Sequence, residues 1–351
     1  MRIDREDLGL RAENIHALTL AGIDNPLEQL LLLTDIKDLV PFPSHNFALL
    51  DHNRLAPSYS DTSSSRVVAV IDHHDDEHLY DDANPRIVAA AGSCSSHVAL
   101  LCPPELPVEL ATFLLCAIVI DTAALKPGGK ALAVDHDAVA FLMPRSTFKD
   151  YTKLRATWLH DIPALKNLDK VLSQKKTDLS HLTPRDLLRR DYKEYTFRTP
   201  HLHPSKPTIK AGLSTVPSPL KAWGCDGKLH IDGYQWMKDR HLSILGVLTT
   251  FRDSVKKNGK GKHRREMAWI IRTDTTISCE CSPDDLNFDQ LAAKLWEGLE
   301  ANKEIALRPH KSFEKKQGEI PSNLKIKLYK QQNADATRKI IAPLLKNIVE
   351  A

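Results

Sequence analysis

Residues 67–74 read Val-Val-Ala-Val-Ile-Asp-His-His, an apolar run that ends in one carboxylate and two imidazoles. Five small or β-branched apolar residues in succession predict a strand buried on both faces, as in a parallel sheet. In open α/β sheets, ligands bind beyond the carboxyl ends of the strands. Asp72, His73 and His74 therefore fall where a binding site is expected.

A second apolar run of the same form precedes it. Residues 47–50, Phe-Ala-Leu-Leu, are followed at once by Asp51, His52 and Asn53. An Asp-His-His triplet alone is a short motif that also arises by chance. Two strands that each end in an Asp-His pair form a stronger pattern, because parallel strands bring these ends to one edge of the sheet.

The charge is divided unequally along the chain of 351 residues. Residues 1–150 contain 11 Lys and Arg against 22 Asp and Glu, whereas residues 151–351 contain 37 against 23. An acidic half suits bound cations and a basic half suits a polyanion. The alternative is ordinary variation of surface charge between two domains.

Two further features of the first half allow either a functional or a structural interpretation. Residues 92–96, Gly-Ser-Cys-Ser-Ser, lie where a helix is expected to begin, so the backbone N–H groups there are open to an anion or to a plain serine cap. A helix predicted from Glu109 ends at Asp121, where the helix dipole disfavours a carboxylate. Either a cation offsets that charge or Asp121 is simply exposed. Residues 26–34, beginning with Pro26, predict another helix.

The second half places cations near two helix starts. Thr183 and Pro184 predict a helix with Arg189, Arg190 and Lys193 in its first two turns, which form either a binding surface or a solvated face. Strands are predicted over 242–251, 267–272 and 324–329. The last helix carries Arg338 and Lys339 in its first turn, against the helix dipole. That arrangement is favourable if both cations and the free N–H groups face a phosphate.

These motifs resemble, in order, those of the DHH phosphoesterase superfamily. The resemblance rests on Asp51-His52-Asn53, Asp72-His73-His74, residues 92–96 and Asp121-Thr122. The second half resembles the associated DHHA2 domain through residues 186–195 and 336–339. Within this group the chain is most similar to the exopolyphosphatase and prune-like branch, relatives of family II inorganic pyrophosphatases.

The resemblance implies a two-domain α/β protein. An N-terminal parallel-sheet DHH domain is expected over 1–143, a linker over 144–158 and a smaller α/β DHHA2 domain over 159–351. The active site is expected in the cleft between the two domains.

The resemblance also implies a role for each motif residue. Asp51 would bridge two divalent metals, and His73 and Asp121 would complete one of them. Asp72 would lie beside these ligands and orient His73, and His74 would contact substrate phosphate. The expected metal is Mn²⁺, with Mg²⁺ or Co²⁺ as alternatives, because carboxylates and imidazole suit these ions.

The expected catalytic set is therefore Asp51, Asp72, His73, His74 and Asp121. Substrate phosphates would be bound by His74 together with the second-domain residues Lys193, Arg338 and Lys339.

One departure from the family pattern affects the expected activity. Members of this group begin with a strand ending in Asp-x-Asp that supplies ligands to both metals, and no such strand precedes Asp51 in this sequence. Asp51, His73 and Asp121 alone would hold one metal firmly. We therefore expect weak or absent activity for the chain as written.

The function implied is hydrolysis of phosphoric anhydride bonds, releasing terminal orthophosphate from inorganic polyphosphate. The alternatives are an inorganic pyrophosphatase or nucleotide phosphodiesterase, or a non-catalytic homologue that binds polyphosphate or a protein. The basic segment 256–265 contains no aromatic residue, which argues against stacked single-stranded nucleic acid. The longest apolar run, 110–120, is too short to span a bilayer, so no membrane partner is expected. Six scattered cysteines predict a reducing, cytoplasmic compartment.

Overall fold

The computed structural model describes residues 4–36, 38–39, 42–56, 59, 64–149, 159–199, 208–253, 261–274 and 288–351. The chain divides into two compact units, Met1–Leu179 and Ser180–Ala351. This boundary lies later than the predicted linker 144–158, of which 150–158 are outside the described residues. Helix α8 (Pro163–Thr177) accounts for the difference, because its Leu165, Leu168 and Leu172 are buried in the core of the first unit.

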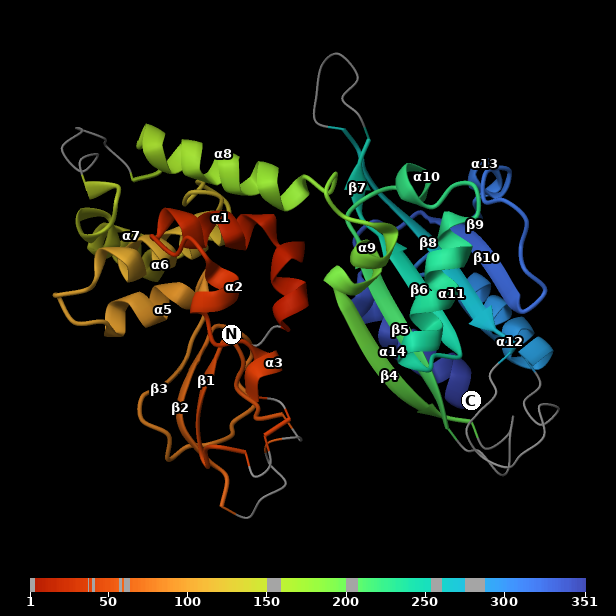
Figure 1. Cartoon of the computed structure of the whole chain (residues 1–351), viewed down its shortest axis with the longest axis horizontal. Helices are drawn as coiled ribbons and strands as arrows, with labels where there is room; N and C mark the ends of the chain where they lie inside the picture. Colours follow the sequence, from red (N-terminus) through yellow and green to blue (C-terminus); the bar gives the residue numbers. More distant parts are fainter. Residues whose placement is uncertain are drawn as a thin grey trace. The chain divides into compact units, whose positions relative to one another are not determined.

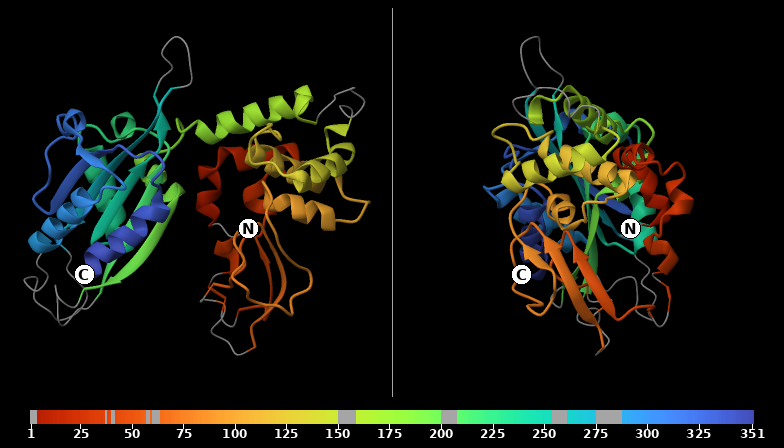
Figure 2. Two further views of the ribbon diagram at one scale, coloured as in Figure 1. Left: turned by 180° about the vertical axis from the view of Figure 1, so that it is seen from behind. Right: turned by 90° about the vertical axis from the view of Figure 1, so that its left-hand side faces the viewer.

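The first unit contains a parallel sheet in the order β1-β2-β3 (Figures 1 and 2). Its strands are β1 (Asn46–Leu50), β2 (Arg66–Asp72) and β3 (Arg86–Val88), so the strands predicted over 47–50 and 67–71 are confirmed. Val67, Val70 and Ile71 are buried. The α/β class and the parallel first sheet are therefore as expected.

The other described elements of this unit are helices. They are η1 (Arg5–Leu10), α1 (Ala12–Leu20), α2 (Pro26–Gln29), α3 (Leu33–Ile36), α5 (Cys94–Leu101), α6 (Val108–Thr122), α7 (Ala133–Leu142), η2 (Met143–Arg145), η4 (Leu159–Asp161) and α8. Of these, α1, α5, α6, α7 and α8 pack around an apolar core. The predicted single helix over 26–34 is wrong. Leu30 is extended, and the N–H of Leu32 donates to the carboxylate of Asp35 at 2.8 Å, which starts a second short helix.

The second unit contains a mixed sheet in the order β4-β5-β6-β8-β10-β9, with β7 paired to β8 (Figure 1). The strands are β4 (Tyr192–Arg198), β5 (Thr208–Val216), β6 (Ile244–Thr249), β7 (Phe251–Arg252), β8 (His263–Arg272), β9 (Leu307–Pro309) and β10 (Leu324–Gln331). Of these pairs, β5 and β6 run parallel and the others antiparallel. Predicted strands 242–251, 267–272 and 324–329 fall on β6 to β7, β8 and β10.

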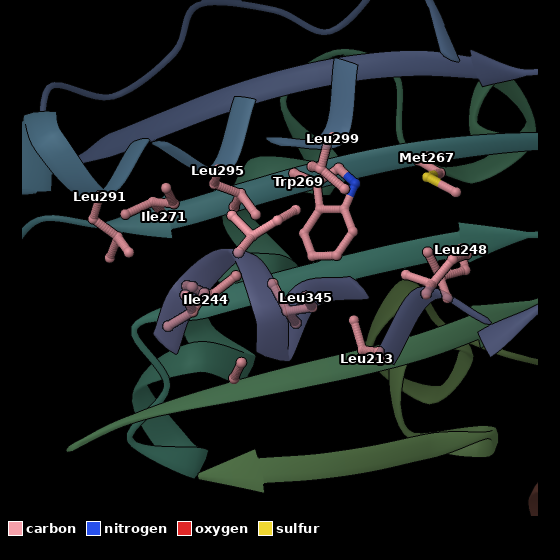
Figure 3. Close-up of a cluster of buried hydrophobic side chains, with 14 of the residues drawn as sticks. Leu213, Ile244, Leu248, Met267, Trp269, Ile271, Leu291, Leu295, Leu299 and Leu345 are labelled. Carbon is pink, nitrogen blue, oxygen red and sulfur yellow. The ribbon is translucent and has the colours of Figure 1, made fainter. Parts of the chain in front are cut away.

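Helices cover both faces of this second sheet. They are α9 (Pro184–Arg190), α10 (Leu220–Trp223), α11 (Lys228–Arg240), α12 (Phe288–Ala301), α13 (Lys311–Glu314) and α14 (Arg338–Glu350). Figure 2 (left) shows α14 in front of the sheet, on the face opposite α11 in Figure 1. Leu295, Leu299 and Leu345 from α12 and α14 meet Trp269 of β8 in a close-packed core (Figure 3). Among the described residues, no helix is both long and apolar enough to cross a membrane.

Candidate metal centre

The parallel pairing of β1 with β2 brings the two polar strand ends together. Leu50 pairs with Ile71, and the N–H of Asp51 donates to the carbonyl of Ile71 at 3.0 Å. Asp51 then turns sharply, with φ 64°. Non-glycine residues seldom adopt this left-handed conformation, although Asp and Asn tolerate it better than most. The turn leaves the Asp51 side chain at the edge of the sheet, next to the residues that follow β2.

The carboxylate of Asp51 faces the ring of His73. Asp51 Oδ1 lies 3.2 Å from His73 Nε2, while His73 Nδ1 lies 3.0 Å from the carbonyl of Ala91. A carbonyl only accepts, so Nδ1 carries a hydrogen and Nε2 of the neutral ring presents a lone pair. This places two acceptor atoms 3.2 Å apart, an arrangement that a cation bound between them would stabilise.

His74 completes a group of three side chains. Its Nδ1 donates to Asp72 Oδ1 at 2.8 Å, which leaves Nε2 as the unprotonated nitrogen of the neutral ring. One ligand atom from each of Asp51, His73 and His74 can be chosen so that all lie within 4.8 Å of one another. Histidines that bind metals characteristically donate through one ring nitrogen and coordinate through the other. The donor set therefore fits a divalent cation.

Asp72 stabilises this group through hydrogen bonds that it accepts from His73 and His74. Its side chain is fully buried, and it accepts from the N–H of His73 at 2.8 Å, from the ring of His74, and from Asn53 Nδ2 at 2.7 Å. Burial raises the pKa of Asp72, but the hydrogen bonds from His74, His73 and Asn53 outweigh it and the pKa lies below its usual value. Asp72 thus stays ionised. The Asp72 carboxylate contacts the ring of His74, whereas the family resemblance implied that it orients His73. The ring of His73 is held instead by the carbonyl of Ala91.

Asp121 lies near this centre but outside the group of three. It is exposed at the end of α6, and its Oδ2 accepts from Ser93 Oγ at 2.7 Å. Burial raises the pKa of the Cys94 thiol to about 11; a hydrogen bond at the Asp51 backbone opposes this shift, and the charges of Asp51, Asp72 and Asp121 add to it. The three carboxylates therefore act on one thiol, although the structure groups His74, and not Asp121, with Asp51 and His73.

The predicted anion-binding N–H groups of residues 92–96 include two that bind a carboxylate of the protein itself, that of Asp135. The N–H groups of Gly92 and Ser93 donate to the Asp135 carboxylate at 2.8 and 3.1 Å. Ser93 precedes α5 and makes no side-chain cap hydrogen bond. The sequence analysis did not single out Asp135, and it named Asn53 in a motif without giving it a role. Asn53 follows directly on Asp51-His52, whereas nothing in the sequence connected Asp135 to Gly92.

In the second unit, Arg338 is held by Asp191. Arg338 Nη1 donates to the carbonyl of Asp191 at 3.0 Å, and Nη2 donates to its carboxylate at 2.8 Å. Burial raises the pKa of Tyr195, and the charge of Arg338 opposes that shift. Arg338 therefore lies near one face of β4, at the start of α14.

The other two predicted phosphate-binding residues are exposed. Lys339 lies in the first turn of α14, and its backbone N–H donates to Thr337 Oγ1 at 3.3 Å. Lys193 was predicted within the helix that follows Thr183, but that helix ends at Arg190 and Lys193 lies on β4. Strand alternation places Lys193 on the same face as Tyr195, which packs against the core that contains α14.

Comparison with known families identifies the second unit. The DHHA2 domain matches residues 170–348, about half of the chain. The chain belongs to the DHHA2 family. With the relatives described next, this match places the chain in the exopolyphosphatase and prune branch of the DHH superfamily. The DHHA2 match includes Lys193, Arg338 and Lys339, whereas Asp51 and His73 lie before it.

Two curated relatives extend the likeness. A Schizosaccharomyces pombe protein named "Putative exopolyphosphatase" is 26% identical over 373 residues, covering 99% of this chain and 81% of that protein. The Rattus norvegicus protein "Exopolyphosphatase PRUNE1" is 29% identical over 201 residues, covering 55% of this chain and 40% of that protein. This chain thus matches less than half the length of the rat protein.

Among solved structures, a "putative family II inorganic pyrophosphatase" from Methanococcus jannaschii is 15% identical. It aligns with a TM-score of 0.46 over 97% of this chain and 88% of that chain.

Proposed function

We propose that this protein is a metal-dependent phosphohydrolase that releases terminal orthophosphate from inorganic polyphosphate. The first unit would bind the divalent cation and the second would bind substrate phosphates. The proposal is supported by the geometry of the candidate metal centre and by the names of the two curated relatives, "Putative exopolyphosphatase" and "Exopolyphosphatase PRUNE1".

One observation carries the proposal. Asp51 Oδ1 and His73 Nε2 lie 3.2 Å apart, and the hydrogen bond from His73 Nδ1 to Ala91 directs the lone pair of Nε2 at the carboxylate. His74 supplies the third donor of the same group. Two imidazole nitrogens and a carboxylate oxygen suit Mn²⁺, Mg²⁺ or Co²⁺, and we propose Mn²⁺ as the first ion to test.

The chain's own residues prepare this centre for phosphate chemistry. A divalent cation, when bound, lowers the pKa of water and polarises phosphoryl oxygens. Asp51, His73 and His74 would hold the cation. Asp72 would keep the Nδ1 hydrogen of His74 in place, so that Nε2 stays directed at the group. We retain Asp121 as a proposed ligand, because Ser93 fixes one of its oxygens near the same centre.

Phosphate binding is assigned to Arg338, Lys339 and Lys193. Asp191 accepts from two nitrogens of Arg338, and a guanidinium has five N–H donors, so donors remain for a phosphate. Asp191 would also limit the rotamers of Arg338, which reduces the entropy lost when substrate binds. Lys193 and Lys339 would add charge on exposed positions.

The test measures orthophosphate released from short-chain polyphosphate by the full chain with added Mn²⁺, before and after chelation. Pyrophosphate and a nucleotide substrate, assayed in parallel, distinguish the two enzymatic alternatives. The variants His73→Ala and His74→Ala should abolish Mn²⁺-dependent release. His78→Ala is the matched control, because the side chain of His78 is 86% exposed and belongs to none of these contacts.

Three outcomes separate the candidate functions. Metal-dependent release that His73→Ala removes supports the hydrolase. Binding of Mn²⁺ and polyphosphate without release supports the non-catalytic homologue. Failure of the wild-type chain to bind Mn²⁺ contradicts the proposed metal centre itself.

A further inference from the structure

Asp135 is a buried carboxylate that the proposed chemistry does not use. It lies in the first turn of α7, its side chain is fully buried, and α5 and α7 pack together (Figure 1). Four hydrogen-bond donors surround it: the N–H groups of Gly92, Ser93 and Leu132 and the hydroxyl of Ser96, at 2.8, 3.1, 2.7 and 2.6 Å. A carboxylate held by four donors is fixed in position.

One of these donors belongs to a peptide group that also touches His73. The N–H of Gly92 donates to Asp135, and the carbonyl of the same peptide, that of Ala91, accepts from His73 Nδ1 at 3.0 Å. A trans peptide is planar, with its N–H and C=O pointing in opposite directions. Fixing the N–H on Asp135 therefore fixes the direction of the carbonyl that holds His73.

The close approach requires glycine at position 92. A Cβ added to Gly92 would lie 2.8 Å from Asp135 Oδ2 and 2.7 Å from Thr122 Cγ2. Real Cβ atoms essentially never come so near, so no side chain fits between α7 and the end of α6 at this point. The peptide can reach Asp135 only because position 92 has none.

A second connection leaves the same carboxylate. The N–H of Ser93 donates to Asp135, and the hydroxyl of Ser93 donates to Asp121 Oδ2 at 2.7 Å. Asp135 is therefore connected by hydrogen bonds through one intervening group to His73 and through another to Asp121, and it contacts neither residue directly. The two connections diverge at consecutive residues, Gly92 and Ser93, so each can be removed separately.

We infer that Asp135 is a positioning residue of the metal centre, which acts through the Ala91–Gly92 peptide on His73 and through Ser93 on Asp121. Its negative charge polarises the peptide, which makes the Ala91 carbonyl a stronger acceptor for His73 Nδ1–H. This selects the tautomer that presents Nε2 to Asp51. The inference rests on the proposed metal-dependent function, and its effect is on metal affinity more than on substrate.

The principal test is Asp135→Asn, which keeps the shape but leaves one carbonyl oxygen to face four donors. The matched control is Asp137→Asn, an exposed carboxylate on the same helix. The first measurement is the Co²⁺ dissociation constant of the full chain from its visible absorption. The second is the ring ¹⁵N spectrum of metal-free protein, well above the ordinary histidine pKa of about 6.5, which reports the tautomer of His73.

We expect Asp135→Asn to weaken Co²⁺ binding about 10- to 100-fold, as loss of an outer contact to a metal ligand typically does. The His73 signal should change from pure Nδ1–H to a mixture of tautomers, with Asp137→Asn unchanged in both measurements. Ser93→Ala should weaken Co²⁺ binding and leave the His73 tautomer as in wild type, because it removes only the contact to Asp121.

Three results would overturn the inference. The first is a folded Asp135→Asn protein with wild-type affinity and tautomer, even if its melting temperature falls, since that is a purely structural role. The second is a wild-type protein in which His73 carries its hydrogen on Nε2. This result would overturn the inference even if Asp135→Asn does not fold. The third is a Ser93→Ala protein that alters the tautomer. Failure of wild-type protein to bind Co²⁺, with the tautomer as expected, contradicts the proposed function and supports the positioning of His73.

Discussion

The buried carboxylates near the candidate metal centre and the carboxylates around Arg338 and β4 have different partners. In the first unit, Asp72 at the end of β2 and Asp135 in the first turn of α7 are fully buried. They accept hydrogen bonds from backbone N–H groups, a hydroxyl, an amide and an imidazole. In the second unit, Glu194 accepts from Lys210 and Arg240, and Asp191 accepts from Arg338.

This difference has an electrostatic consequence. Neutral donors stabilise a carboxylate without cancelling its charge, so negative charge accumulates around Asp51, Asp72 and Asp121. A salt bridge leaves almost no net charge behind. The carboxylates of the metal centre therefore attract a cation. Asp191, in contrast, holds Arg338 in place and leaves some of its N–H donors available to a ligand. The following substitutions test this contrast, from the largest expected effect to the smallest.

Asp51→Asn should have the largest effect. It removes the charged ligand but keeps the side-chain shape, and Asn tolerates the left-handed backbone of this position as Asp does. We expect Mn²⁺-dependent phosphate release to fall by about 100-fold or more, beyond the loss typical of an outer contact. Initial rates and calorimetric Mn²⁺ affinity measure it.

Asp81→Asn is the control for this substitution, since the Asp81 side chain is 88% exposed and forms a long ion pair with Arg86, at 3.8 Å, outside the metal centre. Wild-type turnover in Asp51→Asn would refute the metal centre. A comparable loss in Asp81→Asn would point to general charge effects.

Asn53→Ala should have an intermediate effect. It removes the hydrogen bond to Asp72 Oδ2 at 2.7 Å, so the carboxylate that holds the ring of His74 gains freedom. We expect Mn²⁺ affinity to fall about tenfold, at the lower end for an outer contact. Asn347→Ala, an exposed residue of α14, is the control. Unchanged affinity would show that Asp72 needs no support from Asn53.

Arg338→Ala should raise the KM for polyphosphate about tenfold, since a hydrogen bond to a charged group contributes about 1.5–3 kcal/mol. Its effect on folding should be small, because the side chain of its partner Asp191 is 44% exposed and remains solvated. Arg308→Ala, an exposed arginine on β9, is the control. An unchanged KM in an active protein would remove Arg338 from the phosphate site.

Glu194→Gln should have the smallest effect, and only on stability. Burial raises the pKa of Glu194, but hydrogen bonds from Lys210 and Tyr192 and the charge of Arg240 outweigh it, so the pKa lies below 4.5. A lowered pKa stabilises the fold above the unfolded value, and this contribution is lost as pH falls through the folded value. We expect a difference of less than about 1 kcal/mol at neutral pH.

Denaturant titrations of wild type and Glu194→Gln at neutral and at strongly acidic pH measure this difference. The gap between the two proteins should close in acid. A gap that persists there would show that Glu194 stabilises the second unit by packing and not by charge.

The strands and the strand-end motifs were predictable because their signals are local. An apolar run followed at once by Asp-His identifies both β1 with Asp51 and β2 with His73, and a parallel sheet brings such ends to one edge. The same holds for α14, whose first turn carries Arg338 as predicted. The single helix predicted over 26–34 was wrong because the N–H of Leu32 donates to the Asp35 carboxylate, and a second short helix begins there.

The sequence by itself determined which residues lie at the strand ends, since hydrophobic periodicity and short motifs depend on neighbours along the chain. Only the tertiary structure decided which nitrogen of each histidine is free, that His74 joins Asp51 and His73, and that α8 packs with the first unit. It also brought Asp135 to Gly92, 43 residues away. Hydrogen bonds between distant residues depend on how helices and strands pack, and no local pattern encodes that.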